Sequence, residues 1–175
     1  MIDKKKLRKI CLKNRDGLTE EERKQYSETI CEKLHPYLKG KRVFSYYPCD
    51  SEVDVSQINE LFGVAYPVIR PGRQMDAYQP IDHQMILNRY QIPEPDPGHS
   101  IKIEKEEIDV IIVPCVGFNE KKQRLGHGGG YYDRYLKDCK ALKIAVAYEV
   151  QKLDYDLAEE NDIPVDLIIT EKNTY

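Results

Sequence analysis

Three unbroken apolar runs constrain most strongly what this chain can fold into. They read IDVIIVP (108–114), LKIAVAY (142–148) and VDLIIT (165–170). Runs without polar alternation are typical of strands covered on both faces, as in parallel sheets. Because helical patterns alternate with them, we predict an α/β fold: a single three-layer α/β/α domain with a mainly parallel sheet over residues 1–175. A chain of 175 residues that is 41% hydrophobic can bury one sizeable core of this kind.

The N-terminal half predicts further helices and strands. One helix lies among the first lysines, and a second follows a T-x-x-E capping box at Thr19 and Glu22. Strands are expected at 42–47 and 64–69, with a short helix between them that Asp54 could cap. The expected buried helix positions are Leu7, Ile10, Cys11, Tyr26, Ile30 and Leu34.

Residues 80–100 read as a loop. The string QIPEPDPGHS holds three prolines and a glycine, and both residue types interrupt regular structure. We therefore expect this segment to have little order of its own.

Charge and cysteine content limit the class of protein. The 27 basic and 30 acidic residues give a net charge of -3, so we expect neither a nucleic-acid nor a membrane partner. Five cysteines without a CxxC pair fit neither a disulfide framework nor a zinc site. The charged N-terminus MIDKKKLRKI lacks the apolar core of a signal peptide. We expect a monomer in the reducing cytoplasm.

The string RLGHGGGYYDRYL (124–136) places four glycines within five positions. It follows the strand predicted at 108–114 and precedes a helical pattern, an order that turns backbone N–H groups toward an anion. A Walker loop would need a Lys-Ser/Thr pair after the last glycine, and G-x-G-x-x-G fails at Tyr131. Residues alone leave two alternatives, a phosphate loop of no standard type or a mobile turn. The expected helix face is Tyr131, Tyr135, Leu136 and Cys139.

Together with KKKLR, SEVDV, YQIPEP and IPVDLIITE, this string resembles the 5-formyltetrahydrofolate cyclo-ligase family from about residue 4 to 171. The resemblance implies an ATP- and Mg²⁺-dependent enzyme that converts 5-formyltetrahydrofolate to 5,10-methenyltetrahydrofolate, with release of ADP and phosphate. In the implied route the formyl oxygen attacks the γ-phosphate, N10 adds to the activated carbon, and phosphate leaves. Such phosphoryl transfer needs positioned reactants, a metal and positive charge more than a protein nucleophile.

The resemblance also implies site residues. Lys4 and Arg8, at i and i+4 of a helix, would reach the triphosphate; the alternative is a solvated basic face. Residues 127–131 would also lie near the folate, and Arg124, His127 and Tyr132 would act in catalysis. The segment implied to contact ATP is Arg124, Leu125, Gly126, His127, Gly128, Gly129, Gly130, Tyr131 and Tyr132.

Four further residues are implied for the folate and the metal. Asp54 would contact the pterin and Tyr90 the folate, although an N-cap explains Asp54 equally well. Asp133 and Asp166 would bind Mg²⁺, which usually takes one or two carboxylates plus substrate phosphates. The alternatives are an acid in a helix's first turn and a turn residue at a strand end.

His127 departs from the family, which commonly has arginine at this position of the loop. Histidine is charged only in part near neutrality, whereas arginine always is. We expect neighbouring phosphate oxygens to favour an imidazolium at His127; the alternative is a loop histidine with no role.

Two other kinds of protein remain as alternatives. A regulatory module would bind ATP without turnover, but Asp133 and Asp166 speak against it. A basic arm, KKKLRK, could bind nucleic acid, but Leu7 and Ile10 within it indicate a docked helix, and no nucleic-acid-binding motif accompanies it.

Overall fold

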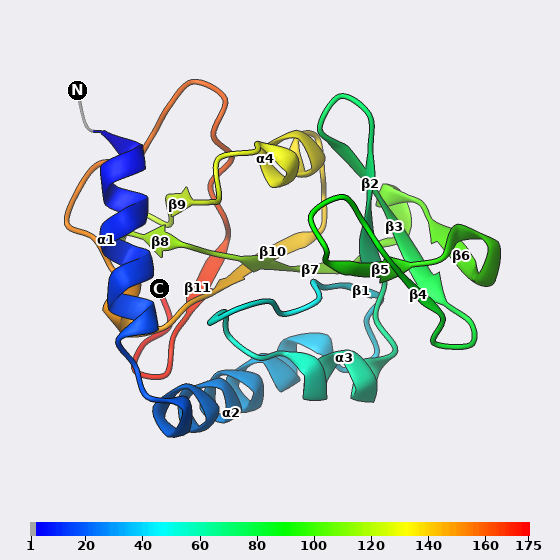
Figure 1. Ribbon diagram of the computed structural model, residues 1–175, viewed down its shortest axis with the longest axis horizontal. Helices are drawn as coiled ribbons and strands as arrows, with labels where there is room; N and C mark the ends of the chain where they lie inside the picture. Colours follow the sequence, from blue (N-terminus) through cyan, green and yellow to red (C-terminus); the bar gives the residue numbers. More distant parts are fainter. Residues whose placement is uncertain (1–2) are drawn as a thin grey trace.

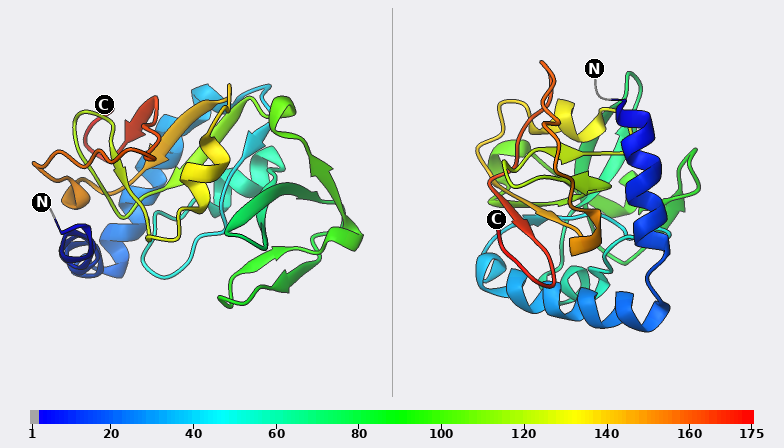
Figure 2. Two further views of the ribbon diagram at one scale, coloured as in Figure 1. Left: turned by 90° about the horizontal axis from the view of Figure 1, so that it is seen from above. Right: turned by 90° about the vertical axis from the view of Figure 1, so that its left-hand side faces the viewer.

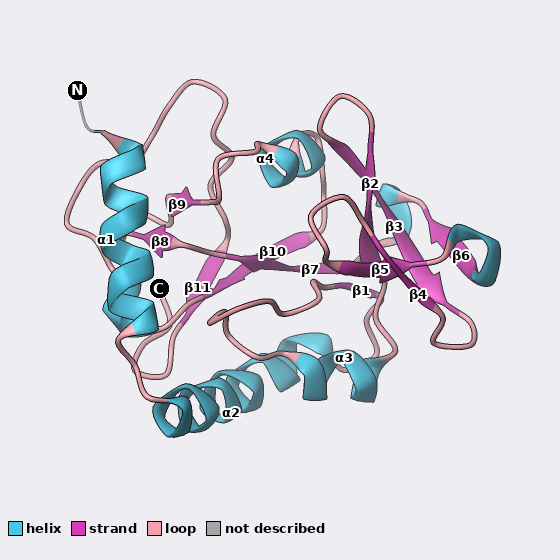
Figure 3. Ribbon diagram, viewed as in Figure 1, coloured by secondary structure: helices cyan, strands magenta, loops and turns pink. Residues whose placement is uncertain are grey.

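The computed structural model describes residues 3–175 and contains a parallel sheet of four strands at its centre. The strand order is β1-β7-β10-β11, as Figures 1 and 3 show. The three apolar runs form β7, β10 and β11, so the predicted α/β fold with a parallel sheet is confirmed. The strands are β1 (Val43–Phe44), β7 (Val110–Pro114), β10 (Leu142–Val146) and β11 (Leu167–Ile169).

Both faces of this sheet are covered, which explains why its strands are apolar throughout. Helices α2 (Glu20–Leu38) and α3 (Ser56–Phe62) lie on one face (Figure 1). The other face packs against α4 (Tyr131–Leu136) and a second, smaller sheet. Alternate residues of β7 divide between these two cores, with Ile112 facing α2 and Ile111 facing α4.

The second sheet was not predicted. It is antiparallel, with order β2-β3-β6, and projects beside the parallel sheet (Figures 1 and 2). Its first strand is the one expected at 64–69, which makes a single parallel bridge between Ala65 and Phe44 and then leaves the central sheet. The strands are β2 (Tyr66–Arg70), β3 (Gln74–Pro80) and β6 (Ser100–Ile103).

The expectation that residues 80–100 have little order is wrong. Two short antiparallel strands, β4 (Met85–Leu87) and β5 (Pro93–Pro95), pair within this segment. Glu94 on β5 is buried, and its carboxylate accepts hydrogen bonds from the Ile69 backbone and the Asn88 amide. Prolines are compatible with a two-stranded ribbon, where each strand has a free edge. A 3₁₀ turn, η1 (Pro97–His99), leads to β6, and another, η2 (Lys105–Glu107), precedes β7.

Helix α1 (Lys4–Asp16) stands at one end of the molecule, beside β8 (Gly117–Phe118) and β9 (Arg124–Leu125), as Figure 1 shows. Leu7 and Cys11 pack into a separate apolar cluster, whereas the predicted core residue Ile10 is 42% exposed because it points away from β8. The other members of this cluster are Val116, Leu125, Leu153 and Leu157, with Leu12 at its edge.

Several local predictions are confirmed. The capping box of Thr19 and Glu22 is present at the start of α2, and Ile30 and Leu34 are fully buried while Tyr26 is partly buried. Helix α4, however, ends at Leu136, before the predicted Cys139.

The last 3₁₀ turn, η3 (Glu149–Gln151), contacts α1. All five cysteines are free. Within residues 3–175, no helix has the length and apolarity needed to cross a membrane.

Candidate functional site

A cleft of about 1050 Å³ collects nearly all the residues implied by the sequence. Its walls come from α1, the loop after β1, the β4–β5 ribbon, the glycine loop, α4 and residues 159–163. In Figures 1 and 2 these segments, far apart in the sequence, gather around the glycine loop. The predicted residues that line the cleft are Lys4, Arg8, Tyr90, Arg124, Leu125, Gly126, His127, Gly128, Gly129, Gly130, Tyr131, Tyr132 and Asp133.

The glycine loop needs its glycines for two physical reasons. Gly128 and Gly130 have φ of +100° and +73°, where L-residues with a side chain are strained. At Gly126 the obstacle is steric, since a Cβ there would lie 2.7 Å from Nη1 of Arg124. The backbone N–H groups of residues 127–129 donate to no acceptor within residues 3–175. These residues line the cleft, so the loop brings unpaired backbone donors to its wall.

Side chains of α1 hold the loop and its surroundings. Nε of Arg8 donates to the carbonyl oxygen of Gly126 at 2.7 Å. Lys4 instead contacts the acidic segment, with its Nζ 2.5 Å from Asp162 and 3.2 Å from Glu159. Both basic residues thus face the cleft, and neither belongs to a merely solvated face.

Arg124, Tyr132 and Asp133 form the floor near the loop. The Arg124 side chain is only 4% exposed, and its Nη2 lies 3.3 Å from Oδ1 of Asp133. Its Nε is buried without a hydrogen-bond partner, and the guanidinium lies 5.7 Å from the centre of the Tyr132 ring. Burial raises the pKa of Tyr132, so the phenol stays protonated.

Tyr90 and Tyr131 meet at the rim. Their hydroxyl oxygens are 3.0 Å apart, and Nη2 of Arg89 donates to both. The rings are perpendicular, with centroids 6.2 Å apart. The tip of the β4–β5 ribbon is thereby joined to the glycine loop.

Two predicted residues lie elsewhere. Asp54 is exposed outside the cleft lining, and its carboxylate accepts from the Ser56 N–H at the start of α3. Asp166 is exposed before β11, where its carboxylate accepts from the backbone of Lys143. Asp133 and Asp166 are therefore not brought together. No cluster of three or more His, Cys, Asp or Glu side chains able to hold a metal occurs within residues 3–175.

Glu52 is the most informative of the cleft residues that sequence reasoning missed. It lies two positions before Asp54, in the same SEVDV string, and lines the cleft. Burial raises the pKa of its carboxyl to about 7, with Asp50 adding to the rise while Arg15 and a hydrogen bond from the Cys49 backbone oppose it. The string alone did not reveal which of its two acids faces inward, because that depends on the path of the loop.

His127 is held in a cationic environment. Partial desolvation by the cleft walls, and the positive charges of Arg15, Arg124 and Arg8, lower the pKa of His127, with Asp50 opposing them. Without ligand the imidazole is therefore mainly neutral at neutral pH, and the imidazolium expected beside bound phosphate stays a prediction.

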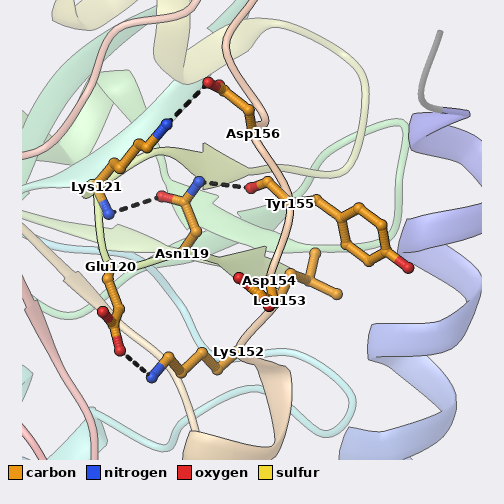
Figure 4. A pocket seen from close by; sticks show the side chains of 8 residues that line it. All are labelled: Asn119, Glu120, Lys121, Lys152, Leu153, Asp154, Tyr155 and Asp156. Carbon is orange, nitrogen blue, oxygen red and sulfur yellow. Dashed lines mark hydrogen bonds and ion pairs between the residues drawn. The ribbon is translucent and has the colours of Figure 1, made fainter.

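A smaller hollow of about 630 Å³ lies on another part of the surface (Figure 4). Its charged side chains pair with each other, Lys121 with Asp156 at 3.0 Å and Lys152 with Glu120. Asn119 is bonded to the carbonyl of Tyr155. These groups are already satisfied, so the larger cleft is the better candidate site.

The fold and cleft define an α/β protein in which a glycine loop and basic side chains line one cleft, and comparison with known proteins identifies the family. The sequence profile of the 5-formyltetrahydrofolate cyclo-ligase family matches residues 1–171, so the chain belongs to this family. It is 32% identical to 5-formyltetrahydrofolate cyclo-ligase of Mycoplasma pneumoniae, over 98% of this chain and 100% of the relative. The Escherichia coli cyclo-ligase is 28% identical, over 89% and 93% of the two chains.

Solved structures agree. The Aquifex aeolicus 5,10-methenyltetrahydrofolate synthetase superposes with a TM-score of 0.86 at 35% identity, covering 98% of this chain and 91% of that one. The Mycoplasma pneumoniae synthetase gives 0.78 at 29% identity, covering 97% and 99%. The family's reaction is the ATP-dependent cyclisation of 5-formyltetrahydrofolate.

The charges around His127 generate a prediction for the free protein. Its imidazole should titrate below the ordinary value of about 6.5, and Asp50→Asn should lower the midpoint further, since Asp50 supplies the opposing negative charge. Asparagine tolerates the left-handed backbone at this position (φ 53°). Histidine NMR signals followed against pH, assigned with His127→Gln, measure both. A midpoint above 6.5, or one raised by Asp50→Asn, contradicts this account.

Proposed function

We propose that this cleft is the active site for cyclisation of 5-formyltetrahydrofolate, with the triphosphate of ATP bound along the glycine loop. Three cations, Lys4, Arg8 and Arg124, face this end of the cleft. The free N–H groups of residues 127–129 point to the same ligand chemistry, because successive backbone donors suit phosphate oxygens. His127 stands within this segment and would gain a proton beside phosphate.

The folate would occupy the other part of the cleft, with its pterin against Glu52. A carboxylate can accept two hydrogen bonds from an amino-pyrimidine edge. This is the role that the resemblance implied for Asp54, which lies outside the cleft. Apolar wall residues and Tyr90 offer a surface for the rest of the molecule; the wall residues are Pro67, Ile69, Met75, Ile92 and Pro93.

The chemistry then requires the chain to position and stabilise the reactants. The formyl oxygen takes the γ-phosphoryl group, N10 closes the ring, and phosphate leaves with the former formyl oxygen. Arg124 is the cation best placed to stabilise charge on the transferred group, because its burial keeps water from screening it. Its partner Asp133 and the ring of Tyr132 hold the guanidinium in place.

The donor set of the cleft also fits Mg²⁺. Oδ1 of Asp133 accepts hydrogen bonds from Arg124 and the Ile163 N–H, whereas its Oδ2 accepts none within residues 3–175. Asp162 adds a second carboxylate to the cleft lining. Mg²⁺ would neutralise phosphate charge from such a position. We assign it to Asp133 and not to Asp166, which the cleft does not include.

The observation that carries the proposal is the convergence, in one cleft, of a glycine loop with unpaired backbone N–H groups and the partly buried acid Glu52. We further propose a cytoplasmic location, supported by five free cysteines, four of which are buried. The monomeric state stays a prediction.

The direct test is the reaction itself. Purified protein with 5-formyltetrahydrofolate, ATP and Mg²⁺ should produce the near-ultraviolet absorbance of the methenyl product. Omitting ATP or chelating Mg²⁺ should abolish it, because both are needed for phosphoryl transfer. Binding of ATP without any turnover would instead indicate a regulatory module.

Gly128→Ala tests the phosphate loop. A side chain at φ +100° costs roughly 1–2 kcal/mol, and the new Cβ would lie 3.4 Å from Cζ of Arg8. We expect ATP affinity, measured by titration calorimetry, to fall at least tenfold. Gly40→Ala is the matched control, since Gly40 has φ +71° and nothing within 4 Å of the added Cβ. It should lose similar stability and no ATP affinity. Equal ATP binding by both variants would return the loop to the mobile-turn interpretation.

Glu52 makes folate binding depend on pH. Since its pKa is raised to about 7, the carboxylate fraction increases as pH rises from 6 to 8. Affinity for 5-formyltetrahydrofolate should therefore strengthen about tenfold over this range. Glu52→Gln should bind weakly at every pH, and Glu60→Gln, an exposed change on α3, should behave as wild type. A wild-type affinity that does not vary with pH would remove Glu52 from the folate site.

A further inference from the structure

Arg15, in the last turn of α1, is a buried cation that the proposed function does not yet use. Arg15 is only 3% exposed, and its Nε donates to Oγ of Ser51 at 2.8 Å. Oγ of Ser51 in turn donates to the carboxylate of Asp16. Nη1 of Arg15 is buried without a hydrogen-bond partner. An unpartnered buried guanidinium nitrogen is costly and calls for a reason.

Glu52, which follows Ser51 in the chain, supplies this reason. It lines the cleft, and the groups that shift the pKa of its carboxyl come from several elements. Its own loop contributes Asp50 and Cys49, which add no positive charge. Tyr46 after β1 and Tyr132 on α4 face it as well, and both remain neutral phenols. Among these neighbours Arg15 alone carries positive charge.

We propose that Arg15 is a positioning residue of the cyclo-ligase reaction, which orients the loop of Glu52 through Ser51 and places a buried positive charge behind the Glu52 carboxyl for the folate. Nη1 is the donor free to pair with this carboxylate when the pterin binds. The inference rests on the proposed folate role of Glu52. Arg15 itself touches neither substrate, since it does not line the cleft.

Helix α1 carries basic residues to both the nucleotide and the folate part of the proposed site. Lys4 and Arg8 near its start face the glycine loop, and Arg15 at its end stands behind the folate acid. One helix thereby sets the distance between the nucleotide and folate parts of the site. A purely structural clamp between α1 and the loop would disturb both parts, whereas a charge effect on Glu52 would disturb the folate part and depend on pH.

Calorimetry with 5-formyltetrahydrofolate alone, and separately with ATP, from pH 6 to 9, distinguishes these roles. The variants are Arg15→Met, Arg15→Lys, Glu52→Gln and Arg15→Met with Glu52→Gln. Arg15→Met should weaken folate binding about tenfold at pH 7, and affinity should recover toward pH 9 as Glu52 ionises. ATP affinity should not weaken. Arg15→Lys should keep most folate affinity, because it keeps the charge.

The double variant and a remote arginine complete the design. Glu52→Gln should add no further loss to Arg15→Met if both act through one carboxylate. Arg23→Met is the control, because Nη1 of Arg23 caps a local carbonyl at Leu18 away from the cleft; it should leave folate binding unchanged at every pH.

Three outcomes would overturn the inference. Equal, pH-independent losses for folate and ATP in Arg15→Met would show a structural clamp. Additive losses in the double variant would show that Arg15 acts apart from Glu52. An unchanged folate affinity in Glu52→Gln would remove the proposed role of Glu52 and, with it, that of Arg15. Turnover of 5-formyltetrahydrofolate by the wild-type protein would still support the proposed reaction. If Arg15→Met does not fold, Arg15→Gln removes the charge in the same way, and an unchanged pH profile of folate binding in Arg15→Gln would also overturn the inference.

Discussion

The hydrogen bond from Nε of Arg8 to the carbonyl oxygen of Gly126, 2.7 Å long, is the contact on which the site depends. A loop that consists mainly of glycine has almost no side chains with which to fix itself, and its freedom must be removed from outside. Arg8 does this from α1, and Arg134 does it from α4 by donating to the carbonyl of Gly129 at 3.0 Å. The backbone carbonyls are thus turned toward arginines, which leaves the N–H groups of residues 127–129 free for a ligand. The apolar cluster beside β8, which holds Leu7 and Cys11, positions α1 and with it Arg8.

Charges of both signs share the cleft, and this affects how an anion enters. Lys4 is held by Asp162 and Glu159 in the protein without ligand, with a side chain only 15% exposed. A triphosphate that reaches Lys4 must therefore exchange one set of oxygens for another, so the net gain from this residue is smaller than its charge suggests. Arg124 differs, because its Nε has no partner to give up. In the proposed site, burial of Arg124 against Asp133 and Tyr132 would therefore make it the more effective cation toward the transferred phosphoryl group.

The sequence predicted the parts of the fold and site that local pattern determines. Apolar runs gave the parallel strands, and the glycine string with its resemblance gave the family and the basic and glycine-loop part of the cleft. Tertiary context decided the rest. Ile10 shares the spacing of Leu7 and Cys11 but points away from β8. The proline-rich segment 80–100 gains its order from a buried Glu94, a long-range contact that composition does not contain. Glu52 faces the cleft and Asp54 does not because of the path of the loop after β1. This segment is neither helix nor strand, so its sequence has no periodicity from which the inward side could be predicted.

The arginines behind the cleft act on the two titrating groups in the same direction. Arg15 favours the carboxylate of Glu52 and the neutral ring of His127, so in both cases it promotes loss of a proton. The ligands have opposite needs, however. An amino-pyrimidine edge donates hydrogen bonds and is best met by an anion, whereas phosphate oxygens are best met by an imidazolium. In the proposed site, the same positive field would favour the anion at Glu52 and would leave His127 to be protonated only when the triphosphate arrives. Where the family commonly has arginine, His127 would then couple nucleotide binding to proton uptake, because its neighbours lower its pKa in the absence of an anion.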